Sequence, residues 1–429
     1  MGAQPDRTAP RDAPPATIGV VGAGTMGAGI AQVALEAGDR VVIHDPDPEA
    51  LARGRERIAD GLARRARSRS ALPAGAAAGP LDPEEALARL RSASDLGGLA
   101  AASEVIVEAV TEDLELKRRL FATLDAAAST TTLLATNTSA LSVAAIASAT
   151  RRPGRVVGLH FFNPAPLMPL VEVVAPVGSA LATVDAAIEL VRHWAKTPVR
   201  STDTPGFIVN RVNRPFTLEA LAMLETGAGT VESIDEAVRA DGFPMGPFEL
   251  MDLVGIDVNL AAARGIFEGF AYEPRYRPSV IQERLVEAGR LGRKSREGFY
   301  WYADDGRRLG VAGAFAVEPE PLDPPGPSLR ALAAGGPVDG PSAMHDPTAE
   351  RIVLAIVNEA YRAVGEGVAD ASDVDLALRL GAGHPSGPFE RVAAFGGPAA
   401  VLARLDRWRR AGPRFDPAPA LVAAAEAAT

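Results

Sequence analysis

The chain of 429 residues has no cysteine, which excludes disulfide bonds, thiol nucleophiles and cysteine-ligated metal sites. It also lacks long apolar runs, and none approaches the roughly 20 residues that a membrane-spanning helix requires. Positive charge is not in excess either: the formal net charge of −10 argues against nucleic acid or an anionic membrane as a general partner. Residues 1–15 lack the apolar segment of a secretory signal peptide, so we expect a disordered tail and a cytoplasmic protein.

Glycine, in contrast, is plentiful, and three glycines form a G-x-G-x-x-G motif in the segment VVGAGTMGAGIAQ. The motif follows a β-branched run at 17–21 and opens a segment, 26–37, whose small and apolar residues favour a helix. Asp45 ends the next apolar run, RVVIHD. This order is typical of a strand–turn–helix unit whose helix start binds a pyrophosphate, while the acid binds a ribose 2′-hydroxyl and repels a 2′-phosphate. We therefore predict that NAD, rather than NADP, is bound by Gly22, Gly24, Thr25, Met26, Gly27 and Asp45.

Strand and helix patterns continue to alternate after this unit. Further apolar runs typical of strands lie at 105–110, 132–139, 155–162 and 170–174. The alternation predicts an α/β Rossmann-type domain, with a parallel sheet covered by helices on both faces. Ligands of such sheets bind beyond the carboxyl ends of the strands. Four polar residues fall at these ends: Glu112, Asn137, Ser139 and His160.

The segment GLHFFNPAPLMPLVEVV at 158–174 places two proton-binding groups, His160 and Glu172, in otherwise apolar strands. A neutral imidazole can accept a hydroxyl proton, and a neighbouring carboxylate can fix its tautomer and stabilise the imidazolium that forms. A hydrogen-bonded core histidine is the structural alternative. The other four histidines have no comparable context, and we interpret them as structural or surface residues.

Together the motifs VVGAGTMGAGIAQ, ATNTSAL, GLHFFNP, LVEVV, DTPGFIVNR and GFPMGPFELMD resemble the L-3-hydroxyacyl-CoA dehydrogenase family, of the 3-hydroxybutyryl-CoA dehydrogenase type, over about residues 17–302. The resemblance implies that His160 is the catalytic base and Glu172 its partner. It also implies that Ser139 and Asn210 bind the substrate's oxygens, and that three further residues contact the cofactor: Glu112, Lys117 and Asn163. Considered by itself, Lys117 could equally be a solvated side chain early in a helix.

A segment of basic residues departs from the family's usual pattern. Family members often carry a lysine-rich arm for coenzyme A, where this chain has RRARSR at 64–69 and a Gly/Ala-rich break at 72–80. The arginines are interpreted either as a solvated helix end or as an arm that meets a phosphate-bearing substrate.

The second half of the chain is helical in pattern and repeats itself. GFPMGPFEL at 242–250 returns as GHPSGPFER at 383–391, which indicates an internal duplication. Glu350 stands near the place of Asn210 in the second copy, so that copy is expected to be structural. The predicted organisation is a tail at 1–15, an NAD-binding domain at 16–202, a helical domain at 203–302, a Gly/Pro-rich linker at 303–346, a second helical domain at 347–412 and a tail at 413–429.

The resemblance implies NAD-dependent oxidation of a (3S)-3-hydroxyacyl-CoA to the 3-oxoacyl-CoA, or the reverse, in fatty-acid or aromatic degradation. Alternatives are a hydroxyacyl group on acyl carrier protein, a free hydroxy acid, or an NAD-binding scaffold without catalysis. Neither nucleic acid nor membrane is an expected partner, and no metal site is expected. The second helical copy is expected to replace a dimer partner, giving a monomer with an internal pseudo-dimer, with a homodimer as the alternative.

Overall fold

The computed structural model describes residues 16–70, 81–316 and 346–427, which form two compact units. The first unit comprises the described residues up to Arg211 together with Ala363–Ala382, and the second comprises Val212–Arg362 and the described residues from Gly383 onward. The predicted N-terminal tail and the Gly/Ala-rich break at 72–80 lie outside the described residues. No helix in the described ranges is long and apolar enough to cross a membrane, and the cytoplasmic location stays a prediction.

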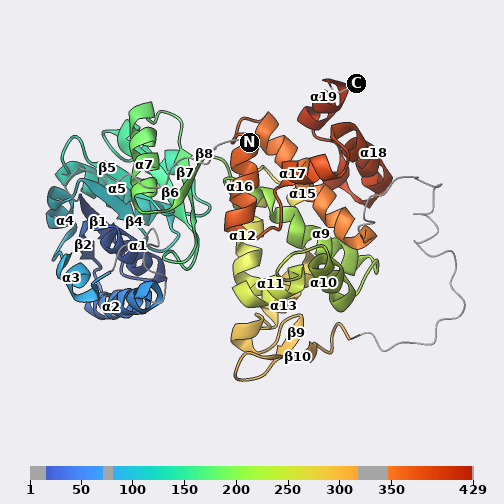
Figure 1. The fold of residues 1–429 in the computed structure, drawn as a ribbon, viewed down its shortest axis with the longest axis horizontal. Coiled ribbons are helices and arrows are strands. Elements are labelled where there is room, and N and C mark those ends of the chain that lie inside the picture. The colour runs from blue at the N-terminus through green and yellow to red at the C-terminus, as the bar shows by residue number, and fades with distance from the viewer. Residues whose placement is uncertain (1–15, 71–80, 317–345, 428–429) are drawn as a thin grey trace, which may run out of the picture. The chain divides into compact units, whose positions relative to one another are not determined.

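An eight-stranded sheet forms the centre of the first unit (Figure 1). Its strand order is β3-β2-β1-β4-β5-β6-β7-β8. The strands are β1 (Thr17–Val21), β2 (Arg40–His44), β3 (Leu90–Ser92), β4 (Val105–Glu108), β5 (Leu133–Thr136), β6 (Val156–Phe161), β7 (Leu170–Ala175) and β8 (Thr197–Thr202). The predicted α/β Rossmann-type domain is therefore confirmed, with β3 and β8 as edge strands that the sequence pattern did not reveal.

Helices cover both faces of this sheet and bury two separate apolar clusters (Figure 1). One cluster lies under α1 (Thr25–Glu36), α2 (Pro48–Ser70), α3 (Pro83–Ala88) and α7 (Leu181–His193). The other lies under α4 (Leu96–Ala102), α5 (Leu114–Ala127) and α6 (Val143–Ala147). The central strands are rich in Val, Ile and Leu because both of their faces are buried, whereas the edge strands β3 and β8 are partly exposed.

The sheet departs from the predicted parallel arrangement at one pair of strands. β6 and β7 are antiparallel, with His160 directly opposite Glu172, while the other strand pairs of this sheet are parallel. The connection between them, residues 162–169, holds no helix. A loop of this length can reverse the chain, whereas a parallel connection needs a crossover of a dozen or more residues.

The second unit is helical, apart from a small antiparallel hairpin of β9 (Tyr300–Tyr302) and β10 (Arg308–Val311). Its first part contains α9 (Arg214–Glu225), α10 (Val231–Ala240), α11 (Pro247–Val254), α12 (Ile256–Gly269) and α13 (Val280–Glu287). Its later part contains α15 (Pro347–Gly365), α17 (Pro388–Ala394), α18 (Pro398–Trp408) and α19 (Pro419–Ala427).

The structure differs from the predicted domain boundaries in three places. β10 lies inside the range predicted as a linker, and α19 lies inside the range predicted as a C-terminal tail. The third difference concerns α16 (Ala371–Gly381), which belongs to the second helical copy by sequence but to the first unit by its contacts. The second copy is therefore not a domain by itself.

Candidate active site

The glycine-rich turn joins β1 to α1 and has the geometry that a dinucleotide needs. Gly22 has a φ of +99°, and a Cβ atom there would lie 2.7 Å from the carbonyl oxygen of Ala109. A Cβ on Gly27 would lie 1.9 Å from the carbonyl oxygen of Gly22, so only glycine allows this turn to close. Gly24, in contrast, faces open space, and as the N-cap of α1 it supplies no side chain to the helix start. The backbone N–H groups there are thus available to a pyrophosphate.

Asp45 lies next to this turn, just after β2. Its Oδ2 accepts a hydrogen bond from the N–H of Ala23 at 2.8 Å, and its Oδ1 accepts one from the N–H of Asp47 at 3.0 Å. Thr25 is exposed and Met26 half-buried in the first turn of α1. These residues fit the predicted NAD site, in which Asp45 would bind the ribose.

His160 and Glu172 form a buried hydrogen-bonded pair across β6 and β7. His160 Nδ1 lies 2.5 Å from Oε2 of Glu172, and the two residues are 4% and 0% exposed. The other carboxylate oxygen of Glu172 accepts the N–H groups of Ile208 and Val209, both at 2.9 Å. Because Nδ1 donates to the carboxylate, Nε2 is left as the proton acceptor of the imidazole. It lies 3.1 Å from Oγ of Ser139.

Two phenylalanines that follow His160 in the chain pack against its imidazole. The ring centroid of His160 lies 4.7 Å from that of Phe162 and 5.6 Å from that of Phe207. Both contacts are tilted ring pairs, and Phe207 is buried. Hydrogen bonding and ring packing together therefore fix the orientation of the histidine.

Glu112 holds the loop that carries Ser139. Its Oε1 accepts hydrogen bonds from the Thr138 hydroxyl at 2.5 Å and from the N–H groups of Ser139 at 2.9 Å and Ala140 at 3.2 Å. Burial alone would raise the pKa of Glu112, but the Lys117 ammonium and these hydrogen bonds together hold it below its usual value. Glu112 is thus an anion that positions Ser139, a function that the sequence did not indicate.

Lys117 is 1% exposed, so the alternative of a solvated side chain is wrong. Its Nζ lies 2.7 Å from Oε1 of Glu108 and 3.3 Å from Oε2 of Glu112. Lys117 therefore neutralises two carboxylates beneath the loop of Ser139. Its contact with the cofactor stays a prediction.

The three asparagines predicted to lie in the site differ in whether their side-chain amides already have hydrogen-bond partners. Oδ1 of Asn137 accepts the N–H of Phe161 at 2.9 Å and so links the ends of β5 and β6. Asn163 is exposed after β6, and Asn210 is half-buried in α8 (Val209–Val212). Within the described ranges the amides of Asn163 and Asn210 have no hydrogen-bond partner, so both can bind a ligand.

Lys196, which the sequence did not single out, fastens the loop between β6 and β7. Its Nζ donates to the carbonyl oxygens of Ala165 at 2.7 Å, Pro166 at 3.1 Å and Met168 at 2.8 Å. Burial lowers the pKa of Lys196 to about 8. The sequence gives no indication that Lys196 binds this loop, because its three partners are backbone carbonyl oxygens, which any residue type provides.

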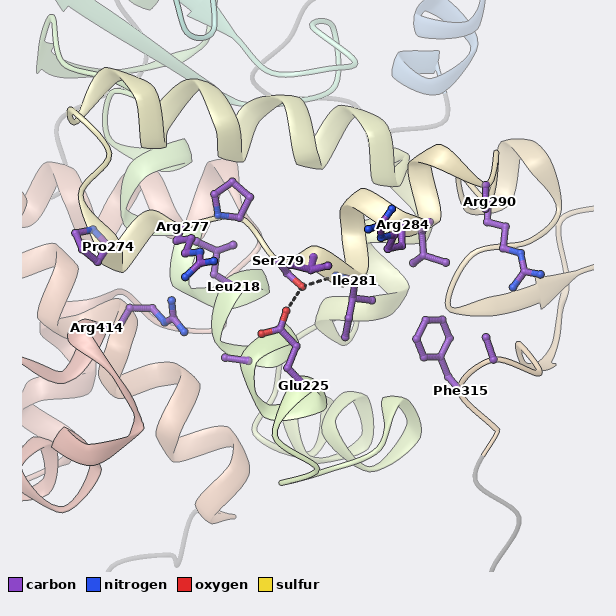
Figure 2. A pocket seen from close by; sticks show the side chains of 16 residues that line it. Leu218, Glu225, Pro274, Arg277, Ser279, Ile281, Arg284, Arg290, Phe315 and Arg414 are labelled. Carbon is purple, nitrogen blue, oxygen red and sulfur yellow. Dashed lines mark hydrogen bonds between the residues drawn. The ribbon is translucent and has the colours of Figure 1, made fainter.

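A cavity of about 610 Å³ in the helical unit contains none of the predicted site residues. Figure 2 shows its mainly apolar lining, with Ser279 donating a hydrogen bond to Glu225. Four arginines also line it: Arg277, Arg284, Arg290 and Arg414. No cluster of histidine and carboxylate side chains in the described part of the chain could hold a metal ion.

Comparison with known proteins gives matches over nearly the whole described chain. Residues 17–204 match the family described as 3-hydroxyacyl-CoA dehydrogenase, NAD binding domain. Residues 206–302 and 348–426 both match the description 3-hydroxyacyl-CoA dehydrogenase, C-terminal domain.

Individual relatives agree with this result. The chain is 39% identical to 3-hydroxyadipyl-CoA dehydrogenase of Escherichia coli K12, over 89% of this chain and 91% of the relative. It is 42% identical to 3-hydroxybutyryl-CoA dehydrogenase of Mycobacterium tuberculosis H37Rv, over 66% of this chain and 98% of the relative. The crystal structure of a 3-hydroxybutyryl-CoA dehydrogenase from E. coli K12 superposes with a TM-score of 0.83 and 36% identity, covering 97% of this chain and 99% of that one.

Proposed function

The chain belongs to the 3-hydroxyacyl-CoA dehydrogenase family, and from that premise we propose that His160 is the base of its NAD-dependent oxidation of a 3-hydroxyacyl-CoA. The observation that carries the proposal is the pair of His160 and Glu172, held at 2.5 Å with Ser139 on the other imidazole nitrogen. Nε2 of His160 takes the proton of the 3-hydroxyl group. A bound NAD would supply the acceptor for the hydride that leaves C3 of the substrate.

The neighbouring residues act on the same oxygen atom. Glu172 keeps the proton on Nδ1 and stabilises the imidazolium once Nε2 is protonated. The hydroxyl of Ser139 and the amide of Asn210 are proposed to donate hydrogen bonds to the substrate oxygen, which favours its conversion to a carbonyl. The carboxylate needs no movement during the step, since two backbone N–H groups already fix it.

Kinetics of two substitutions test this assignment. His160→Ala removes the base, so kcat should fall by about 10²–10⁴ while the fold and the affinity for NAD remain. Glu172→Gln should reduce kcat less, because the imidazole is retained without the charge that orients it. Near-normal turnover by His160→Ala would rule out the proposed base.

The cofactor-binding residues are proposed as a set: Gly22, Gly24, Thr25, Met26, Gly27, Asp45, Glu112, Lys117, Asn137 and Asn163. Among them Asp45 is proposed to select NAD, because a carboxylate repels a 2′-phosphate. Replacing Asp45 by Ser, together with an arginine at Pro46, should move the preference towards NADP. The ratio of kcat/KM for the two cofactors measures this, and a parent enzyme that prefers NADP would contradict the role of Asp45.

We propose coenzyme A as the carrier and an acyl group whose far end is a carboxylate, as in the substrate for which the E. coli relative 3-hydroxyadipyl-CoA dehydrogenase is named. NADH formation with 3-hydroxybutyryl-CoA, 3-hydroxyhexanoyl-CoA and 3-hydroxyadipyl-CoA measures the preference. The adipyl substrate should give the highest kcat/KM. The same acyl groups on acyl carrier protein, and the free hydroxy acids, test the alternative carriers.

The two helical copies are further proposed to derive from a duplication and to pair within one chain. Reciprocal ion pairs support this: Glu219 of the first copy binds Arg414 at 2.5 Å, and Glu359 of the second copy binds Arg275 at 3.0 Å. Each arginine lies in a similar Pro-Arg-aromatic turn, at 274–276 and 413–415. Such an exchange is typical of an interface with twofold symmetry.

Sedimentation of a chain cut near Asp304 tests the internal pairing. Removal of the second copy exposes the interface of the first, so the shortened chain should dimerise or aggregate while the full chain needs no partner for that surface. A shortened chain that is monomeric and as stable as the parent would contradict the pairing.

A further inference from the structure

Residues 363–382 of the second helical copy pack within the Rossmann unit, against the edge of its sheet. The N–H of Thr202, in the edge strand β8, donates to the carbonyl oxygen of Val368 at 2.9 Å. The N–H of Arg200 donates to Oδ2 of Asp373 at 3.1 Å. These bonds satisfy backbone donors that an edge strand otherwise leaves unpaired.

Gly381, the last residue of α16, lies close to residues that contact the catalytic pair. A Cβ atom there would lie 2.7 Å from Cδ2 of Leu170, 3.0 Å from Cγ2 of Val209 and 3.4 Å from Cζ of Phe162. Gly381 does not have a positive φ, so its backbone accepts any side chain. The requirement for glycine is therefore one of space.

Two of these three neighbours touch the catalytic pair directly. The N–H of Val209 donates to Oε1 of Glu172, and the ring of Phe162 packs on the imidazole of His160. The third neighbour, Leu170, begins β7, the strand that carries Glu172. A side chain added at Gly381 would thus displace residues that directly contact His160 and Glu172.

We propose that the second helical copy positions the catalytic pair through Gly381. Val209 and Phe162 pack into the space that the missing side chain of Gly381 leaves open. This inference rests on the proposed function of His160 and Glu172. It makes the second copy a part of the active-site architecture in addition to a pairing partner of the first. Gly381 acts through Glu172 and His160 and is a positioning residue.

Substitutions of Gly381 by Ala and Val test the proposal in the full chain. The added atoms push Val209 and Phe162 towards the pair, and misplacement on the scale of 1 Å costs up to about 10²-fold in rate. We expect kcat to fall several-fold for Gly381→Ala and roughly tenfold to a hundredfold for Gly381→Val. The KM for NAD should stay within about twofold, because the three nearest neighbours of a Cβ at Gly381 are outside the glycine-rich turn.

Gly229, in the first helical copy, offers a matched control. A Cβ there would lie 2.8 and 3.1 Å from Ile234 and 3.4 Å from Ser233, and it too lacks a positive φ. Gly229→Val should therefore lower the melting temperature to a similar extent without changing kcat. Gly381→Val with the kcat of this control would overturn the proposal.

A double substitution separates positioning from loss of folding. Val209→Ala removes the methyl group that meets the new Cβ while keeping the backbone N–H that binds Glu172. Gly381→Ala combined with Val209→Ala should recover most of the kcat and the parent's pH–rate profile. No recovery in a folded double variant would contradict the proposed path. Failure of the catalytic assignment is distinguishable, because His160→Ala would then remain active.

Discussion

The two helical copies share a sequence pattern but differ in what surrounds it. In both, a Gly-Pro-Phe-Glu segment starts a helix, and the glutamate accepts the glycine's N–H, at 2.9 Å from Gly246 to Glu249 and 2.8 Å from Gly387 to Glu390. In the first copy Asp252 follows and binds the β9–β10 hairpin, whereas the second copy has Ala393 at the matching position. The comparison teaches that the two copies have the same local helix start but differ in what each helix binds.

Substitutions of the two glutamates that form the reciprocal ion pairs between the helical copies should lower the free energy of unfolding most. Glu219→Ala removes a fully buried carboxylate that binds Arg351 at 2.5 Å and Arg414 at 2.5 Å, leaving two nearly buried cations. Breaking such a cluster costs about 3–5 kcal/mol in free energy of unfolding. Glu359→Ala should cost less, because Arg275 keeps Glu273 at 3.3 Å.

Denaturant unfolding measures both effects. Glu189→Ala is the control, since its exposed pair with Arg192 should contribute no more than about 1 kcal/mol. Equal, small effects of Glu219→Ala and Glu189→Ala would contradict the view that the copies are held together at this cluster.

Asp252→Ala gives the first copy the residue that the second copy carries. The carboxylate accepts the N–H groups of Phe299 and Tyr300 and the hydroxyl of Tyr302, so its loss should cost about 1–3 kcal/mol. Burial raises the pKa of Asp252 to about 6, against these three hydrogen bonds. Because the folded pKa lies above the unfolded value of 3.8, the stabilisation is complete below about pH 3.8 and declines as the pH rises through about 6.

Chemical unfolding at a series of pH values checks the sign. The difference in free energy of unfolding between parent and Asp252→Ala should be larger at pH 4.5 than at pH 7.5. A difference that grows with pH would show that Asp252 is held as a carboxylate with a lowered pKa. Ala393→Gly, at the matching position of the second copy, should change stability without this pH dependence.

The smallest effects are expected at the shared helix starts. Glu390→Ala removes the acceptor of the Gly387 N–H and should cost about 0.5–2 kcal/mol. Glu249→Ala removes the acceptor of the Gly246 N–H and also the ion pairs of Glu249 with Arg239 and Arg308. Thermal unfolding of both variants compares the copies directly, and an effect at only one of them would show that the motif has lost its function in the other.

The sequence predicted those features that local patterns determine. The glycine-rich turn and the strands of the sheet centre follow from turn residues and β-branched runs, and the family resemblance implied the pairing of His160 with Glu172. The sequence could not reveal the burial of Lys117 or the hydrogen bond from the Ser139 N–H to Glu112, since both depend on residues from different elements. The assignment of α16 to the Rossmann unit was also out of reach, because it depends on contacts between segments about 170 residues apart.

The antiparallel pairing of β6 and β7 restricts how this chain can vary in length. Side chains alternate between the two faces of a strand, so one residue inserted between Val156 and His160 would turn the imidazole to the opposite face, away from Glu172. An insertion in the loop at 162–169 leaves the register of both strands intact. Viable insertions and deletions in this part of the gene should therefore cluster in the loop, and a library scored by NADH production would map the strand boundaries without any structure.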